Sequence, residues 1–359
     1  MRIFLVEPYF GGSHRQWAEG YRAASSHEVH LITHDARFWK WRMAGGHVTL
    51  GRLAAGVAAE HGPPDVLLAS DMLNLPAFLG ATREFLGEPG VALYMHENQL
   101  TYPASSVAAD DLSYAMINWA SVDAADAVFF NSEFHLDGFF AALPELLGRY
   151  PDYRHSSLVP GARSKSGVLA VGIDLAVLDG VPPERSRPAL ILWNQRWEHD
   201  KNPAEFFAAL DALIADGVEF RVALAGEVFS TSPGEFDAAR ERLGARLVHF
   251  GFAELDTYRR LLRSADVVVS TARHEFFGVA IIEAIYAGAW PVLPDRLAYP
   301  GHIPAPHHDR VLYADFDGLV EKLRDAVVGE RESLSSAVGR YDWSEVVGDY
   351  DSAMESLVK

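Results

Sequence analysis

Residues 270–288, STARHEFFGVAIIEAIYAG, lead from a strand-like segment into a helix-like one. The preceding valine-rich run, ADVVVST (265–271), favours a strand. The run that follows has apolar residues at helical spacing, and Gly278 is placed to open this helix. Glu275 is therefore expected in the strand-to-helix loop, and Glu283 about two helical turns later, among apolar neighbours.

The same alternation runs through the whole chain of 359 residues. Apolar runs predict strands in both halves, at residues 3–6, 29–33, 65–70, 91–95 and 127–130, then at 189–194, 220–226, 246–251, 265–271 and 290–294. Amphipathic segments lie between them. Strands this apolar, separated by helices, predict an α/β fold with parallel sheets covered on both faces.

The length exceeds that of one typical hydrophobic core, so two domains are expected. Residues 166–188 are rich in Pro, Gly, Ser and Arg and predict a linker. We expect doubly wound, Rossmann-like domains over residues 1–165 and 189–340, facing a cleft, with a helix in 341–359 packing back on the first domain. In such folds ligands bind at the carboxyl ends of the strands.

Composition limits the classes of function. A net charge of −18, with 31 basic and 49 acidic residues, argues against sequence-blind nucleic-acid binding but allows a local basic site. The absence of cysteine excludes disulfides, thiolate catalysis and Cys-ligated zinc. No apolar segment approaches the ~20 residues of a membrane span, and the N-terminal apolar run is too short for a signal peptide. We expect a cytoplasmic protein without a membrane partner.

The start of the predicted 278–288 helix offers free amides and a glycine, which suit a diphosphate. Glu283 is a carboxylate in an apolar helix and needs a partner. The hydroxyl pair of a ribose would serve. A helix cap with a salt bridge is the structural alternative.

A second candidate segment, NQRWEHDKNP (194–203), follows the strand at 189–194. Its cations Arg196 and Lys201 could neutralise a diphosphate leaving group. Alternatively, they form surface ion pairs with Glu198 and Asp200.

Two loops of the N-terminal half also follow predicted strands. PYFGGSHRQW (8–17) carries Gly11, Gly12 and His14, but the chain contains neither a GxGxxG fingerprint nor a P-loop. YMHENQLTYP (94–103) gathers the polar residues His96, Glu97 and Asn98. Such crowding favours contacts with a sugar or another substrate, although a lone histidine is more often structural.

The segment RFWKWR (37–42) concentrates cations and tryptophans on an acidic chain. Tryptophan can stack on a base and Arg or Lys can contact phosphates. With Arg149, Arg154, Arg163 and Lys165 near the linker, the segment could form a local basic track, while plain packing is the alternative. A further group, His302, His307, His308 and Asp309, lacks convincing metal-ligand spacing. We expect no metal.

Together these segments resemble retaining glycosyltransferases of the GT-B fold, in family 4, and among them the tRNA-queuosine α-mannosyltransferases. The resemblance covers residue 7 to about residue 300 and is carried by EPYFGGSHRQ, FWKWR, MHENQLTYP, FNSEF, QRWEHDKNP, HEFFGVAIIEA and DRLAYP. No single motif among them is as specific as the set.

The resemblance implies GDP-mannose as donor, held mainly by the C-terminal domain, and queuosine in the anticodon of tRNA-Asp as acceptor. It implies catalytic roles for His96, Glu275, Arg196 and Lys201, and donor contacts by Gly11, Gly12, Arg196, Lys201, Glu275, Phe277, Gly278 and Glu283. The acceptor would meet His14, Arg37, Trp39, Lys40, Trp41, Glu97 and Asn98. No metal or other cofactor would be required.

Other readings stay open at this point. A family 4 enzyme could act on a glycan, a lipid or a small metabolite. An epimerase of similar fold would need no acceptor, and a silent nucleotide-sugar or tRNA-binding module would show no turnover. The sequence does not indicate an oligomeric state.

Overall fold

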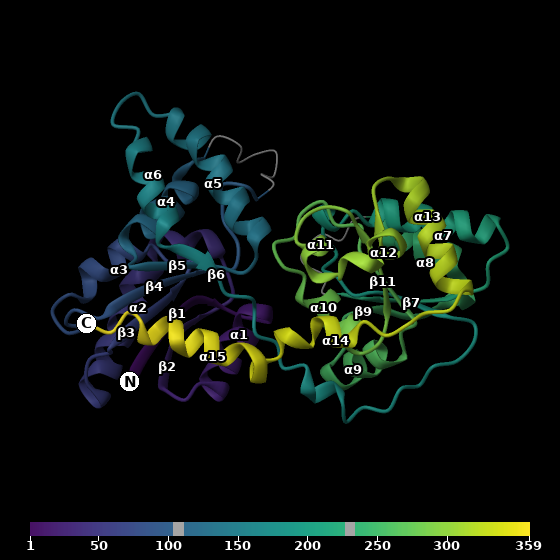
Figure 1. The fold of residues 1–359 in the computed structure, drawn as a ribbon, viewed down its shortest axis with the longest axis horizontal. Coiled ribbons are helices and arrows are strands. Elements are labelled where there is room, and N and C mark those ends of the chain that lie inside the picture. The colour runs from purple at the N-terminus through teal and green to yellow at the C-terminus, as the bar shows by residue number, and fades with distance from the viewer. Residues whose placement is uncertain (103–110, 227–233) are drawn as a thin grey trace. The chain divides into compact units, whose positions relative to one another are not determined.

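The computed structural model describes residues 1–102, 111–226 and 234–359, and only Pro103 of the segment YMHENQLTYP lies outside them. The chain divides into two compact units, Met1–Asp174 with Tyr341–Lys359, and Leu175–Arg340 (Figure 1). The first unit extends beyond the predicted boundary at residue 165 because Ser166–Val168 pair with its sheet.

The first unit contains a six-stranded parallel sheet of order β2-β1-β3-β4-β5-β6. Its elements are β1 (Arg2–Phe10), α1 (Gly12–Ala24), β2 (Glu28–Asp35), α2 (Trp39–His61), β3 (Val66–Ser70), α3 (Leu75–Thr82), β4 (Gly90–Met95), α4 (Ser113–Ala124), β5 (Ala127–Phe130), α5 (Glu133–Gly148), α6 (Val159–Ser164), β6 (Ser166–Val168) and α15 (Trp343–Glu355). β3 and β4 are buried along their whole length, as their unbroken apolar runs require.

Helix α15 lies alongside α1 in the first unit (Figure 1). Trp17 Nε1 of α1 donates to the Tyr350 hydroxyl at 3.1 Å, and the Asp351 carboxylate accepts from Tyr21 and Ser25 at 3.1 and 2.6 Å. The Trp343 ring covers Gly20 so closely that a Cβ there would lie 2.0 Å from its Nε1. The C-terminal helix is thus an integral part of the first unit.

The second unit repeats the architecture with a parallel sheet of order β12-β11-β10-β7-β8-β9. Its elements are β7 (Leu190–Trp193), α7 (Pro203–Ala215), β8 (Arg221–Ala225), α8 (Glu235–Leu243), β9 (Leu247–Gly251), α9 (Leu255–Ser264), β10 (Val267–Val269), α10 (Val279–Tyr286), β11 (Trp290–Pro294), α11 (Tyr299–His302), α12 (His308–Val311), β12 (Leu312–Tyr313), α13 (Phe316–Val328) and α14 (Ser335–Val338). Because β7 and β10 are neighbours, the loops that follow them meet at one edge of the sheet.

These sheets confirm the predicted α/β class, and every predicted strand is present. The apolar pattern does not predict the short edge strands β6 and β12 or the helix α2. Among residues 1–102, 111–226 and 234–359, no helix combines the length and the apolar character needed to cross a membrane.

The contact between Gly20 and Trp343 makes a prediction about stability. Gly20→Ala should destabilise the protein by about 1–3 kcal/mol, because the added methyl group overpacks the α1–α15 contact. Gly56→Ala is the matched control: a Cβ at this position of α2 meets nothing within 4 Å, so alanine should stabilise by roughly 0.5–1 kcal/mol. Urea unfolding measures both, and equal effects would contradict the packing explanation.

Candidate functional site

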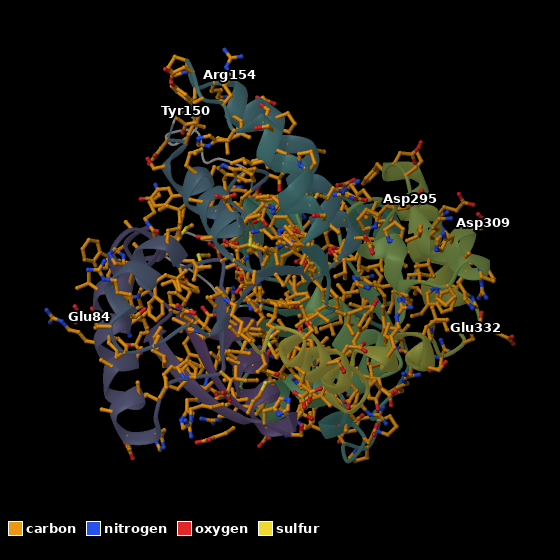
Figure 2. All side chains as sticks on the ribbon, turned by 60° about the vertical axis from the view of Figure 1, so that its left-hand side comes forward. Glu84, Tyr150, Arg154, Asp295, Asp309 and Glu332 are labelled. Carbon is orange, nitrogen blue, oxygen red and sulfur yellow. The ribbon has the colours of Figure 1, made fainter. Side chains whose placement is uncertain are left out.

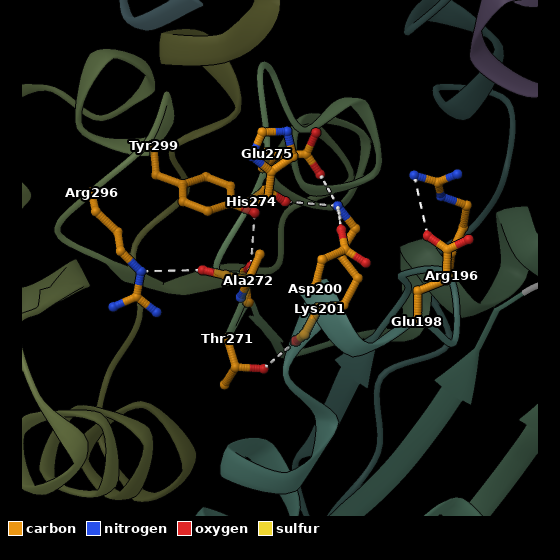
Figure 3. A network of polar contacts seen from close by, with 11 residues as sticks. Arg196, Glu198, Asp200, Lys201, Thr271, Ala272, His274, Glu275, Arg296 and Tyr299 are labelled. Atoms are coloured by element: carbon orange, nitrogen blue, oxygen red, sulfur yellow. Dashed lines mark hydrogen bonds and ion pairs between the residues drawn. The ribbon is translucent and has the colours of Figure 1, made fainter. Parts of the chain in front are cut away.

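The loops after β7 and β10 are joined by hydrogen bonds (Figure 3). The Thr271 hydroxyl donates to the carbonyls of Lys201 and Asn202 at 2.9 and 3.0 Å. The Arg273 amide donates to the Asp200 carbonyl at 2.8 Å. The two loops that carry the predicted donor-site residues therefore form one structure.

Lys201 is the centre of this structure. Its buried Nζ donates to the His274 carbonyl at 2.9 Å and lies 3.1 Å from Glu275 Oε2 and 3.2 Å from Asp200 Oδ2 (Figure 3). Burial lowers the pKa of Lys201, but Glu275 and Asp200 raise it above its ordinary value. Burial likewise raises the pKa of Glu275, and Lys201 more than reverses this. Lys201 and Glu275 are therefore both charged at neutral pH.

Arg196 lies on the same loop with its side chain 46% exposed and pairs with Glu198 at 3.5 Å (Figure 3). Arg196 and Lys201 thus contact Glu198 and Asp200, the acidic partners that the alternative of ion pairing predicts. The five side chains Arg196, Lys201, Glu198, Asp200 and Glu275 together carry a charge of −1. The charge of a diphosphate at this site would be met more by backbone amides and Arg196 than by Lys201. Arg196 would first have to turn away from Glu198.

Glu283 is bonded to Tyr258, which Asn194 contacts in turn. Its Oε2 accepts from the Tyr258 hydroxyl at 2.7 Å, and Asn194 Nδ2 donates to that hydroxyl at 3.1 Å and to the Ala280 carbonyl at 2.7 Å. Burial raises the pKa of Glu283 to about 7, although Tyr258 and Arg259 lower it. The sequence could have identified Asn194, because this residue directly follows β7. Nothing in the sequence of α9 distinguishes Tyr258.

The loop at Phe277 and Gly278 is supported from residues 295–302. Gly278 has a φ of 92°, and a Cβ there would lie 3.1 Å from Tyr299 Cε1. The Tyr299 and Ser270 hydroxyls are 2.7 Å apart, and His302 Nε2 donates to the Phe277 carbonyl at 2.7 Å. Burial lowers the pKa of His302 to about 4, so the ring is neutral. Its role here is to hold the loop.

In the first unit, His14 and His96 lie beside Glu7 at the carboxyl ends of β1 and β4. His14 Nδ1 is 3.1 Å from Glu7 Oε2, and the two imidazole rings are 4.1 Å apart. Burial would lower the pKa of His14, but Glu7 raises it to about 9. Burial and the neighbouring His14 hold the pKa of His96 well below its ordinary value. A cationic His14 therefore stands next to a neutral His96.

The remaining residues of these loops differ in role. A Cβ on Gly11 would lie 2.4 Å from Ala36 Cβ, and Gly12 has a φ of 51°, so packing and backbone conformation both favour glycine. Asn98 is fully buried, and its side chain bonds to Leu100 and Thr101 within its own loop. That Asn98 meets the acceptor stays a prediction. Glu97 accepts from Gln99 at 2.9 Å.

The segment RFWKWR enters a helix, since α2 begins at Trp39 after Phe38 in the left-handed region, with a φ of 53°. Trp39 packs against Tyr114, with ring centroids 5.1 Å apart, and Lys40 Nζ lies 5.6 Å from the centre of the Trp39 ring. Trp41 is 64% exposed, and Arg37 is exposed beside it. An aromatic and basic surface therefore surrounds the start of α2.

Four further cations, predicted to extend this surface, have partners of their own. Lys165 Nζ donates to the carbonyls of Asp123 and Ala125 at the end of α4. Arg163 pairs with Asp137, Arg149 pairs with Glu145, and Arg154 at the tip beyond α5 donates to the Tyr150 carbonyl (Figure 2). Lys165 thus has a structural role, and a continuous track is not supported.

Within the described parts of the chain, two side-chain groups bring possible metal ligands within 4.8 Å of one another, Glu7 with His14 and His96, and Glu28 with His30 and His61. The raised pKa of His14 opposes ligation in the first group. In the second, Arg2 and His30 already engage Glu28, at 3.1 and 2.8 Å. That the protein needs no metal stays a prediction.

The comparisons with known proteins cover both halves of the chain. Residues 2–173 match the family described as tRNA-queuosine alpha-mannosyltransferase N-terminal, and residues 179–338 match glycosyl transferases group 1. The tRNA-queuosine alpha-mannosyltransferase of Drosophila melanogaster is 33% identical over 331 residues, which span 89% of this chain and 85% of the relative. The chain belongs to the tRNA-queuosine alpha-mannosyltransferase family. It is a glycosyltransferase, as the resemblance predicted.

More distant relatives agree in fold. A GDP-mannose:cellobiosyl-diphosphopolyprenol alpha-mannosyltransferase of Xanthomonas oryzae pv. oryzae is 29% identical over 202 residues, 53% of this chain and 52% of the relative. Among solved structures, the lipopolysaccharide outer core galactosyltransferase WaaB has a TM-score of 0.64 at 14% identity over 99% of each chain. A trehalose-6-phosphate synthase has a TM-score of 0.69 at 13% identity over 100% of each. These similarities confirm the GT-B fold.

The Lys201 contacts predict a large effect on stability. Lys201→Met should destabilise the protein by about 3–5 kcal/mol, because it leaves Glu275 and Asp200 close together without their cation. Lys201→Met combined with Glu275→Gln should lose less than the single variant, since one buried charge is removed with the cation. Urea unfolding of the wild type, the two single variants and the double variant measures this, and strictly additive losses would refute the coupling.

Proposed function

We propose that the chain is a retaining glycosyltransferase that moves mannose from GDP-mannose to queuosine in the anticodon of tRNA-Asp. The observation that carries the acceptor is the relative from Drosophila melanogaster, which is similar over 89% of this chain. The names of the Xanthomonas relatives specify GDP-mannose and support the donor. An anticodon substrate places the reaction in the cytoplasm.

The donor binds to the loops of the second unit. Its diphosphate meets the amides near Phe277 and Gly278 at the start of α10, and Arg196 turns from Glu198 towards it. Glu283 accepts hydrogen bonds from the ribose hydroxyls. Lys201 pairs with Glu275 and holds its carboxylate beside the mannose. It also adds a positive charge to the donor site.

The reaction exchanges one bond for another on the same face of the sugar. The bond between mannose C1 and the phosphate oxygen breaks, and a bond from C1 to the acceptor oxygen forms. The acceptor proton passes to the departing phosphate oxygen, which becomes more basic as it leaves. Side chains and amides meet the diphosphate charge, so the scheme includes no metal or other cofactor.

The acceptor RNA contacts the first unit at the start of α2. Trp41 and Phe38, which are 64% and 77% exposed, offer faces on which bases can stack. Arg37 and Lys40 lie beside them to contact phosphates.

A lipid-linked glycan is the second candidate acceptor. The Xanthomonas relatives, named for a cellobiosyl-diphosphopolyprenol acceptor, favour it, although they span only 53% of this chain. A protein of this kind would glycosylate a polyprenol-linked saccharide and leave tRNA unchanged.

Nucleoside mass spectrometry of tRNA-Asp, after incubation with the protein and GDP-mannose, tests the proposed function. A hexose should be added to queuosine, and queuosine-free tRNA should stay unmodified. The variant Lys40→Ala with Trp41→Ala should raise the KM for tRNA without changing the affinity for GDP. Binding of GDP-mannose with no tRNA product would reject the acceptor and favour the lipid-linked glycan. Consumption of GDP-mannose without any acceptor would indicate an epimerase or hydrolase instead.

Glu283 predicts a pH dependence of donor binding. Its pKa of about 7 means that the carboxylate, the form that accepts from a ribose, grows as the pH rises from 6 to 8, so GDP affinity should rise over this range. Tyr258→Phe removes a hydrogen bond that lowers this pKa, so the rise should shift to higher pH, with roughly a 2- to 10-fold loss at pH 7.

The control for this experiment is Tyr286→Phe on α10, whose hydroxyl contacts Asp179 on the protein surface, and it should leave the profile unchanged. Calorimetric titration with GDP at several pH values measures all three proteins. A loss in Tyr258→Phe that is the same at every pH would indicate a purely structural role for Tyr258.

A further inference from the structure

Three buried polar atoms at the carboxyl ends of β3 and β4 have no hydrogen-bond partner in the described structure. They are Ser70 Oγ, Asp71 Oδ2 and His96 Nε2. Leaving a buried polar atom unpaired costs free energy, most of all for a carboxylate. Such atoms therefore indicate a place where a ligand supplies the missing hydrogen bond. Neither Ser70 nor Asp71 has a part in the reaction described above.

Asp71 is 1% exposed and rigidly held. Its Oδ1 accepts from the His96 amide at 2.8 Å, and its own amide donates to the Tyr94 carbonyl at 3.0 Å. Asn118 Nδ2 donates to its carbonyl at 3.1 Å. These contacts fix the residue and leave the second carboxylate oxygen for another group.

The charges around Asp71 restrict what that group can be. Glu7 and Glu97 lie near it and would repel a phosphate. Glu7 is already engaged by His14 and by the Tyr9 amide, at 3.1 and 2.8 Å, and His14 is an imidazolium, so a metal ion would have to displace these contacts. A neutral group that offers a hydroxyl hydrogen fits a buried carboxylate oxygen that has no partner.

We propose that Asp71 Oδ2 accepts a hydrogen bond from a hydroxyl group that queuosine has and the unmodified nucleoside lacks. This rests on the proposed function. The acceptor is favoured over the donor mannose because Asp71 lies within residues 2–173, the part of the chain that matches the N-terminal half specific to the tRNA-queuosine family. Asp71 is thereby a residue that distinguishes queuosine from an unmodified nucleoside.

The variant Asp71→Asn tests this with little change in structure, because the amide oxygen can still accept from the His96 amide while a donor replaces Oδ2. The kcat/KM for queuosine-containing tRNA should fall about 10- to 100-fold, and the affinities for GDP and GDP-mannose should not change. The control is Asp126→Asn. Asp126 Oδ2 also accepts from a backbone amide, that of Val91, but at the opposite end of β4, so this variant should keep the kcat/KM of the wild type.

The pH profile of kcat/KM distinguishes a direct contact between Asp71 and the acceptor from a purely structural role of Asp71. Burial raises the pKa of Asp71 well above its ordinary value, with His14 lowering it and Glu97 and Glu7 raising it. The wild-type kcat/KM should rise as this carboxyl ionises, and Asp71→Asn should lose that step. If Asp71→Asn unfolds at a lower temperature, Asp71→Ser provides a second variant with a hydroxyl acceptor for the His96 amide.

Equilibrium binding gives a readout independent of turnover. The wild type should bind queuosine-containing tRNA more tightly than queuosine-free tRNA, and Asp71→Asn should abolish the difference. If Asp71→Asn keeps both the preference and the rate, the inference is wrong while the proposed function stands. Weaker binding of GDP-mannose but not of GDP would assign Asp71 to the donor sugar instead. A wild type with neither preference nor product would overturn the proposed function, and the inference with it.

Discussion

The second unit depends on one buried ammonium group. Lys201 Nζ joins the loop after β7 to the loop after β10 through the His274 carbonyl and the Glu275 carboxylate, and it also pairs with Asp200 of its own loop. Without it, two negative charges would face each other at the edge of the sheet, and the turn at Phe277 and Gly278 would lose its anchor. Tyr299 and His302 then hold that turn from the other side. A strongly paired lysine is therefore better suited to organise this site than to move during a reaction.

The two units handle buried charge differently. In the second unit the carboxylates around Lys201 outnumber the cations, so the group keeps a net negative charge even with Arg196 counted. In the first unit, Glu7 and His14 neutralise each other and leave Asp71 without a full set of partners. Both arrangements occur at the carboxyl ends of parallel strands, where side chains from neighbouring strands converge.

Sequence patterns were sufficient for the interior strands and for the residues in the loops that follow them. Apolar runs locate β3, β4 and β10, and the glycine after β10 locates the start of α10. They miss Tyr258 and Asp71, because the contacts that make these residues notable come from segments distant in the sequence. They also miss Glu7, whose partner His14 lies beyond the turn from β1 into α1. They also miss α2, whose interior glycines weaken the helical pattern. Nor do they show that the polar groups of Asn98 and Lys165 bond to nearby backbone.

The first unit is discontinuous in sequence, since it is completed by residues 341–359. The two chain segments that enter and leave the second unit pair with each other, as Ile173 donates to the Tyr341 carbonyl at 2.9 Å and accepts from the Trp343 amide at 3.0 Å. On the ribosome, all of the second unit emerges before α15 does. The first unit begins synthesis before the second but is completed after it. Trp17 and Tyr21 can bond to Tyr350 and Asp351 of α15 only once the second unit has been synthesised.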